Sequence, residues 1–190
     1  MAAMAARRSA GVLLFRRPGD GELELLLVHP GGPFWARKDE GAWSIPKGEY
    51  EDGQDARAAA LREFAEEIGR PVEVCRAPGA TAEAADSGID TDAATGAGAG
   101  AEATVQLPLI ELGTLRQPGG KIVTAWAAEG DLDPAAVVSN TFELEWPPRS
   151  GKRQQFPEID RAEWFTVPRA RTKILRGQTG FIDALLEALG

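Results

Sequence analysis

The sequence predicts an α/β fold in which helices cover both faces of a mixed sheet. Short apolar runs bounded by Gly and Pro are typical of strands, and they alternate with helix-like patterns at residues 54–68 and 168–189. The chain has 190 residues, of which 43% are hydrophobic, and this is enough for one complete core. We therefore expect a single domain that spans residues 8–188.

The first third of the chain predicts two strands, a loop and a helix. Residues 9–16 and 22–29 are rich in Leu and Val and flank a turn that contains Pro and Gly, so an antiparallel hairpin is expected. Residues 34–53 contain three glycines and show no helical period, which predicts a long loop. A helix should follow at residues 54–68, with Gly69 ending it.

The second half of the chain predicts further strands and two C-terminal helices. Residues 105–116 and 121–129 flank the turn-rich residues 117–120, which indicates a second hairpin rather than a phosphate-binding loop, because the spacing of such a loop is absent. The remaining expected elements are strands at 72–75, 142–146 and 162–167 and helices at 133–138, 168–175 and 178–189.

Residues 77–104 differ sharply in composition from the rest of the chain. They are rich in Ala, Gly and Thr, include no basic residue, and carry Ile89 as their only large apolar side chain. Such a segment cannot contribute much to a core. We interpret it as a low-complexity insertion that is dispensable for the chemistry.

Composition excludes several classes of partner. The formal net charge of −8 leaves no broad basic surface for a nucleic acid duplex. Cys75 is the only cysteine, so no intramolecular disulfide can form, which suits the reducing cytoplasm. No stretch approaches the ~20 apolar residues of a membrane span. We expect a cytoplasmic protein with no membrane partner.

A cluster of carboxylates on the predicted helix is the strongest functional signal. Glu63, Glu66 and Glu67 lie at positions i, i+3 and i+4, so they share one helix face, opposite to Phe64 and Ile68. Like charges at this spacing destabilise a bare helix, and a hard divalent cation with oxygen ligands would offset the repulsion. A solvated acidic face is the alternative for these glutamates taken alone.

Residues 48–70, taken as one string, resemble the Nudix box, G-x5-E-x7-R-E-U-x-E-E-x-G-U, in which U is an apolar residue. The required positions are matched by Gly48, Arg62, Glu63, Phe64, Glu66, Glu67 and Gly69. Gln54 stands where the first glutamate belongs, and Arg70 stands where an apolar residue belongs. The resemblance implies the Nudix α/β/α sandwich with a mixed sheet.

The resemblance also implies roles for these residues. Members of this family hydrolyse a nucleoside diphosphate linked to another group, with Mg²⁺ or alternatively Mn²⁺. Glu63, Glu66 and Glu67 would hold the ions, with Glu63 and Glu67 also in catalysis. Arg62 would orient the glutamates by pairing with Glu66. Gly48 and Gly69 would permit the tight path of the chain on either side of the helix.

A fourth carboxylate is suggested by its position late in the chain. In several members of this family a loop glutamate six residues before a tryptophan is an extra metal ligand or the general base. Glu158 precedes Trp164 by this spacing, in an expected loop at residues 155–160. An ordinary surface role for Glu158 stays open. The rival carboxylates are Asp160, Glu143 and Glu145.

Residues that could contact the substrate are suggested by a second resemblance and by aromatic content. The sequence Trp43-Ser-Ile-Pro-Lys-Gly is similar to the W-x-x-P-K-G segment of Nudix enzymes that act on diadenosine polyphosphates, in which the lysine reaches a phosphate. Lys47 is therefore the predicted phosphate ligand. Aromatic side chains could stack on a base. The candidates for stacking are Trp43, Trp35, Phe34 and Trp146.

Two functions remain open from the sequence. The first is metal-dependent hydrolysis of a phosphoanhydride bond in a dinucleoside polyphosphate or nucleoside triphosphate. Other nucleotide-linked substrates are not excluded. The rival is a Nudix-fold module that senses a nucleotide without cleaving it, which only Gln54 favours. His29 is expected to be structural, and a homodimer is left open.

Overall fold

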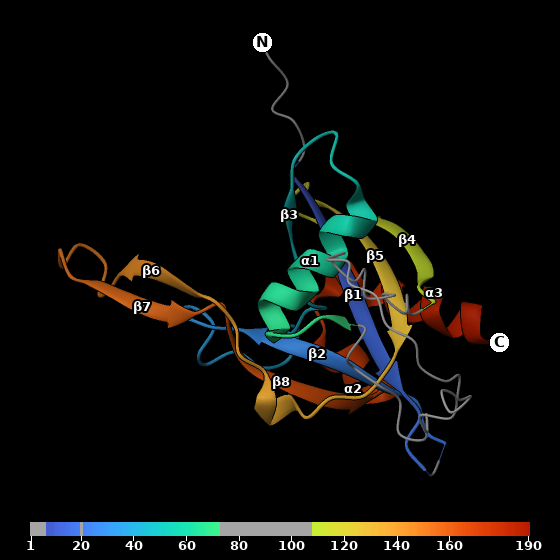
Figure 1. The fold of residues 1–190 in the computed structure, drawn as a ribbon. Helices are drawn as coiled ribbons and strands as arrows, with labels where there is room; N and C mark the ends of the chain where they lie inside the picture. The colour runs from blue at the N-terminus through green and yellow to red at the C-terminus, as the bar shows by residue number, and fades with distance from the viewer. Residues whose placement is uncertain (1–6, 20, 73–107) are drawn as a thin grey trace, which may run out of the picture.

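The computed structural model describes residues 7–19, 21–72 and 108–190 (Figure 1). The larger sheet has six strands within these ranges. They are β1 (Arg8–Arg16), β2 (Glu24–Pro30), β3 (Lys47–Tyr50), β4 (Ile110–Arg116), β5 (Ile122–Glu129) and β8 (Ile159–Thr166). Residues 73–75 of the expected strand at 72–75 lie outside the described residues. The insertion at 77–104 also lies outside them.

Helices cover both faces of this sheet, as the sequence predicts. Helix α1 (Ala56–Ile68) lies on one face, and α2 (Val167–Lys173) and α3 (Thr179–Leu189) lie on the other (Figure 1). Between the last two lies a 3₁₀ turn, η3 (Arg176–Gln178). The short helix expected at 133–138 is a single 3₁₀ turn, η2 (Pro134–Ala136). None of the helices among the described residues is long and apolar enough to cross a membrane.

Strand β1 is apolar along almost its whole length because both of its faces are buried. Val12 and Leu14 point into the cluster that packs against α1, whereas Leu13 and Phe15 point into the cluster that packs against α3. The sheet is therefore the middle layer of a three-layer α/β/α sandwich, and its two cores are separated by the strands.

The topology of the sheet is mixed and centres on β1. The strand order is β4-β5-β1-β2-β8. Strand β1 runs parallel to β5 and antiparallel to β2, and β4 and β5 form the predicted antiparallel hairpin. The expected N-terminal hairpin is confirmed in the same way, with Phe15 opposite Leu25.

The second edge of β1 is divided between two partners. Strand β2 pairs with β1 only at Phe15 and Arg16, whereas β3 pairs with residues 8–11 at the other end. The segment that precedes β3 runs into the fork between β1 and β2, where Val12 N–H donates to Pro46 O and Val28 bridges to Ser44. The prediction of a loop throughout residues 34–53 is therefore wrong at its end, because β3 completes the edge of β1.

A third hairpin projects away from the main sheet (Figure 1). It consists of β6 (Thr141–Glu145), which the sequence predicts, and β7 (Arg153–Pro157), which it does not. The prediction of a loop at 155–160 is also wrong, because strands occupy most of this segment. Strand β7 ends at Pro157, β8 begins at Ile159, and Glu158 is the single residue between them. Alternation in β7 is weak because almost all of its residues are exposed.

Candidate functional site

Helix α1 holds its glutamates in a fixed orientation. The Asp55 side chain caps its first turn by accepting from Ala58 N–H at 2.7 Å. Gly69, with φ of 81°, ends the helix and donates its N–H to Ala65 O. Phe64 and Ile68 are fully buried against the sheet. Because this apolar face is fixed, Glu63, Glu66 and Glu67 face away from the core.

Glu67 connects the helix to the start of β3. Its Oε2 atom accepts the backbone N–H of Lys47 at 2.8 Å. The pKa of Glu67 is raised to about 7, chiefly by burial and also by the charges of Glu63 and Glu158, although the Lys47 ammonium and N–H oppose the shift. The alternative of a fully solvated acidic face does not hold at Glu63 and Glu67, because both residues are half-buried.

Lys47 lies beside the Glu67 carboxylate, and its surroundings disfavour the charged form of the lysine. Burial lowers the pKa of the Lys47 ammonium, and the neighbouring Glu67 partly opposes this shift. The segment before Lys47 is held from the far side of the sheet, because the buried Gln178 side chain accepts from Ile45 N–H at 3.1 Å. The predicted phosphate ligand thus has a fixed backbone next to a helix carboxylate.

Glu63 and Arg62 form a second contact near Gly48. Arg62 donates to Glu63 at 2.6 Å, and its Nε atom lies 3.7 Å from Glu66, so the expected partner Glu66 is the more distant one. The bond to Glu63 raises the pKa of Arg62. Glu63 packs directly on Gly48, where an added Cβ would lie 1.5 Å from Oε2. The missing side chain of Gly48 therefore makes room for the Glu63 carboxylate.

Glu158 reaches the same site from the junction of β7 and β8. Its backbone is held at both ends, since its N–H donates to Asn140 O and its carbonyl accepts from Gly31 N–H. Its carboxylate is exposed, and its charge is among those that raise the pKa of Glu67. The structure therefore brings Glu158 within electrostatic range of the helix glutamates.

The rival carboxylates all have structural partners. Asp160 contacts His29 at 2.7 Å, Glu143 pairs with Arg153 at 2.8 Å, and Glu145 accepts from Gly151 N–H. His29 is fully buried, and its second nitrogen lies 2.9 Å from Lys38 O. This agrees with the structural role expected for His29 and leaves Glu158 as the loop carboxylate with an uncommitted side chain among the described residues.

The expectation that Trp43 stacks on a base is wrong. Trp43 is only 1% exposed, its indole N–H donates to Asp39, and its ring packs against Phe165 and His29. Asp39 is in turn paired with Lys173 of α2, an interaction that lowers the pKa of Asp39. Trp43 therefore anchors the loop before Lys47 and has no free face for a ligand.

Trp35 remains a candidate for a substrate contact. It is half-buried against the core, and the Lys38 ammonium lies 4.4 Å from the centre of its ring. Sequence reasoning missed the anchors on the opposite side of the loop, namely Asp39, Lys173 and Gln178. No local signal could have found them, because Asp39 and Lys173 are 134 residues apart in the chain.

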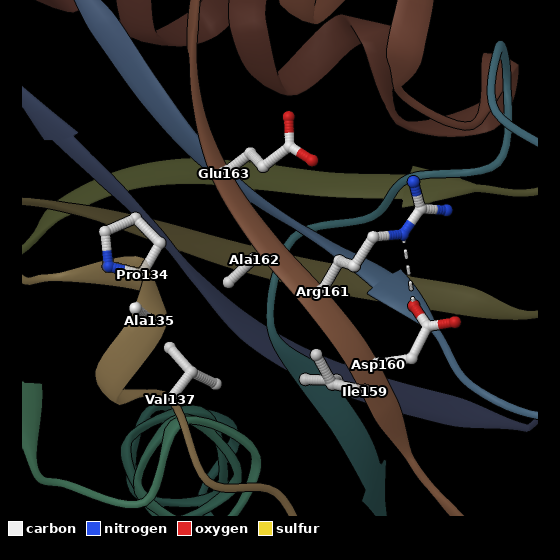
Figure 2. A pocket seen from close by; sticks show the side chains of 8 residues that line it. All are labelled: Pro134, Ala135, Val137, Ile159, Asp160, Arg161, Ala162 and Glu163. Carbon is white, nitrogen blue, oxygen red and sulfur yellow. Dashed lines mark ion pairs between the residues drawn. The ribbon is translucent and has the colours of Figure 1, made fainter.

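Two cavities lie around this region. One, of about 470 Å³, is lined by the loop before α1 and includes Gln54 and Arg62. The side chain of Gln54 accepts from Glu51 N–H, so it stabilises the turn that leads into the helix. The other, of about 360 Å³, lies between η2 and β8, next to Glu158 in the chain (Figure 2). Figure 2 shows Arg161 and Asp160 of this wall paired with each other.

The residues fit a divalent cation in their chemistry. Glu63, Glu67 and Glu158 supply oxygen ligands, and a cation would offset both the burial and the neighbouring negative charges that raise the pKa of Glu67. The side chains of Glu63 and Glu67 are directed at protein partners, and no group of three acidic, imidazole or thiol side chains within the described ranges is already arranged to hold an ion.

Comparison with known proteins gives one family match. The family model described as the NUDIX domain matches residues 5–132. An RNA pyrophosphohydrolase from Dinoroseobacter shibae is 62% identical over 32 residues, which cover 17% of this chain and 20% of that protein. The chain thus matches only about a fifth of the length of this curated relative.

Similar solved structures support the fold alone, because their sequence identities are low. A C. elegans Ap4A hydrolase in a binary complex has a TM-score of 0.54 at 19% identity and covers 95% of this chain and 96% of its own. The NUDIX domain of Shewanella oneidensis NrtR, solved with ADP ribose, also has a TM-score of 0.54, at 16% identity, and covers 100% of this chain and 92% of its own.

The packing of Glu63 on Gly48 predicts a selective effect of Gly48→Ala. The new Cβ would displace the end of a flexible side chain, so the melting temperature should change little, whereas turnover should fall by about 10- to 100-fold because the Glu63 carboxylate loses its position. Thermal unfolding and metal-dependent hydrolysis would be measured in parallel.

Gly11→Ala is the contrasting substitution, because its Cβ would meet backbone and the Cβ of Lys47 rather than the end of a flexible side chain. Its Cβ would lie 2.4 Å from the backbone oxygen of Pro46, which cannot move freely, so the variant should lose about 1–3 kcal/mol of stability. Normal turnover in Gly48→Ala would contradict the assigned position of Glu63.

Proposed function

Because the chain belongs to the NUDIX domain family, we propose that it hydrolyses a phosphoanhydride bond in a nucleoside diphosphate-linked substrate. The family model and the name of the curated relative support a hydrolase that acts on pyrophosphate bonds. The leading substrate classes are dinucleoside polyphosphates and nucleoside triphosphates. The resemblance of the Trp43–Gly48 segment to enzymes that act on diadenosine polyphosphates favours the first class.

The proposal rests chiefly on the surroundings of Glu67, where helix α1, the start of β3 and the β7–β8 junction come together. Its carboxylate accepts from Lys47 of β3, and its pKa reflects burial together with the charges of Glu63 and Glu158. A cation-binding group of oxygens therefore lies next to a lysine whose ammonium is poorly solvated. A polyphosphate with its divalent counterion would satisfy both charges.

The metal in this proposal is Mg²⁺, with Mn²⁺ as the alternative. Glu63, Glu66, Glu67 and Glu158 would hold it. When bound, such an ion neutralises the polyphosphate, polarises a phosphorus and lowers the pKa of bound water. Carboxylates are the ligand type that both ions prefer.

Each remaining residue has a role that follows from its position. The Lys47 ammonium would contact a phosphate oxygen. The phosphate would then replace Glu67 as the main negative charge beside the ammonium. Arg62 would keep the carboxylate of Glu63 directed along the helix, as it does through their bond at 2.6 Å. Glu158, exposed and without a structural partner among the described side chains, would accept the proton of the attacking water.

The rival function, a sensing module without catalysis, rests on the absent charge at Gln54. The hydrogen bond from Glu51 N–H to the Gln54 side chain gives this residue a role in the turn, which needs no carboxylate. All three helix glutamates are present, and this favours catalysis over sensing.

A hydrolysis screen tests the proposed function. Dinucleoside polyphosphates, nucleoside triphosphates, nucleotide sugars and 5′-triphosphate RNA would be incubated with Mg²⁺ or Mn²⁺, and the products identified. The prediction is turnover of a dinucleoside polyphosphate or a nucleoside triphosphate that stops when the metal is chelated. Glu67→Gln, which can still accept from Lys47 N–H, is the control and should lose turnover by orders of magnitude. Tight binding without turnover of any substrate would favour the sensing module.

Glu158→Gln tests the assignment of the general base. The amide cannot accept a proton, so kcat should fall much more than KM changes, and the acidic limb of the pH profile should disappear or shift. Asp160→Asn is the comparison, because Asp160 is bound to His29. An unchanged profile in Glu158→Gln would pass the role to Glu63 or Glu67.

A further inference from the structure

The β6–β7 hairpin contains none of the residues to which the proposed chemistry assigns a role. It extends away from the sheet that carries the site (Figure 1), and its two strands pair only with each other among the described strands. A two-stranded hairpin is marginally stable alone. It is supported at one side by residues 31–34, where Phe142 packs on Gly32 and Phe34 packs on Trp146.

Aromatic rings cover this side of the hairpin. Phe34 and Trp146 meet edge to face, with ring centroids 5.5 Å apart and an interplanar angle of 81°, and Phe142 lies 6.0 Å from Phe156. Phe34 is 60% exposed, the larger part of its ring facing solvent. An exposed aromatic ring supported by a second ring is a surface on which a planar base can stack.

The tip of the hairpin is basic in an acidic protein. Residues 146–153 contain three cations and no acidic residue, although the net charge of the chain is −8. Arg153 pairs with Glu143. Arg149 and Lys152 are exposed, and neither forms an ion pair within the described part of the chain. The aromatic surface therefore has two free cations next to it, which complement a phosphate group.

The hairpin is continuous with the candidate site. Strand β7 runs directly into Glu158, and Gly31 N–H, at the start of the segment that carries Phe34, donates to Glu158 O. Thr141 lies opposite Pro157 at this end, and Trp146 is five residues further along the chain from Thr141. At about 3.4 Å per residue, Trp146 lies roughly 17 Å from the Glu158 end of the hairpin.

We propose that the hairpin and residues 31–34 bind the second nucleoside of a dinucleoside polyphosphate whose reacting phosphates lie at Glu67 and Glu158. This inference rests on the proposed function and narrows its substrate class. The base stacks on Phe34 and Trp146, and Arg149 and Lys152 contact the phosphates that lead to it. A nucleoside triphosphate, with one nucleoside, leaves this surface empty.

Phe34→Ala tests this inference, because Phe34 is exposed and its truncation leaves the core intact. Steady-state kinetics would compare diadenosine tetraphosphate with ATP in the presence of Mg²⁺. Stacking of one base predicts a KM for diadenosine tetraphosphate that rises about 5- to 100-fold, with the KM for ATP unchanged. Lys152→Ala should raise the same KM by a smaller factor that shrinks at high salt.

Binding provides a readout that does not need turnover. With Ca²⁺ in place of Mg²⁺, the affinity of each variant for the same two nucleotides would be measured by calorimetry. Val138→Ala and Arg169→Ala are the matched controls, since they also remove an exposed apolar and an exposed basic side chain. Neither should change the affinity for either nucleotide.

The outcomes separate this inference from the proposed function. Equal losses for both nucleotides, or no loss for either, would overturn the second-nucleoside surface while wild-type hydrolysis upholds the proposed function. Failure of the wild-type protein to bind or hydrolyse either nucleotide would contradict both.

Discussion

The shared edge of β1 is the constraint on which the site depends. Full pairing of β1 with β5 uses one edge, and the other is divided between β2 and β3. The fork between these partners admits the segment before β3, whose backbone continues the hydrogen bonding through Val12 and Val28. Lys47 therefore leaves the fork beneath α1, where its N–H meets Glu67.

The same segment is anchored from the opposite layer of the fold. Trp43 fills the core beneath α2, Asp39 pairs with Lys173, and Gln178 holds Ile45 N–H. Buried polar groups are costly unless they are hydrogen-bonded, so these contacts specify one path for the loop. The site thus combines residues whose positions are fixed by both helical layers, although its carboxylates all lie on the α1 side.

Electrostatics gives this arrangement its chemical character. Burial and neighbouring carboxylates raise the pKa of Glu67, while burial lowers the pKa of Lys47. Each shift disfavours the charged form of its group, and each would be opposed by a ligand of opposite charge. A metal-bound polyphosphate carries both charges, which is why this pair fits the activity supported by the NUDIX family match better than it fits a purely structural salt bridge.

The sequence predicted most of the helices and the box residues because their signals are local. The spacing of Glu63, Glu66 and Glu67, the cap at Gly69 and the apolar face at Phe64 are all set within one helix. Strand β3 was missed because it is short and its residues are polar or half-buried, and β7 was missed because it lies outside the core.

Long-range contacts explain the errors at individual residues. Trp43 belongs to a motif typical of nucleotide enzymes, yet its burial is decided by Phe165 and Asp39, which the motif does not contain. The proximity of Glu158 to Glu67 depends on how β7 and β8 meet. Only the resemblance to the Nudix family could suggest that proximity from the sequence.

The most direct test of the central claim is the number of protons released when the metal-free protein binds Mn²⁺. A pKa of about 7 means that Glu67 holds a proton in roughly half of the molecules at pH 7, and a metal ligand must lose it. Calorimetric titrations in two buffers of different ionisation enthalpy should show release of about half a proton at pH 7 and almost none at pH 9, with weaker Mn²⁺ affinity as the pH falls. Glu67→Gln should abolish the release. Absence of Mn²⁺ binding, or binding with equal proton release at both pH values, would contradict the account.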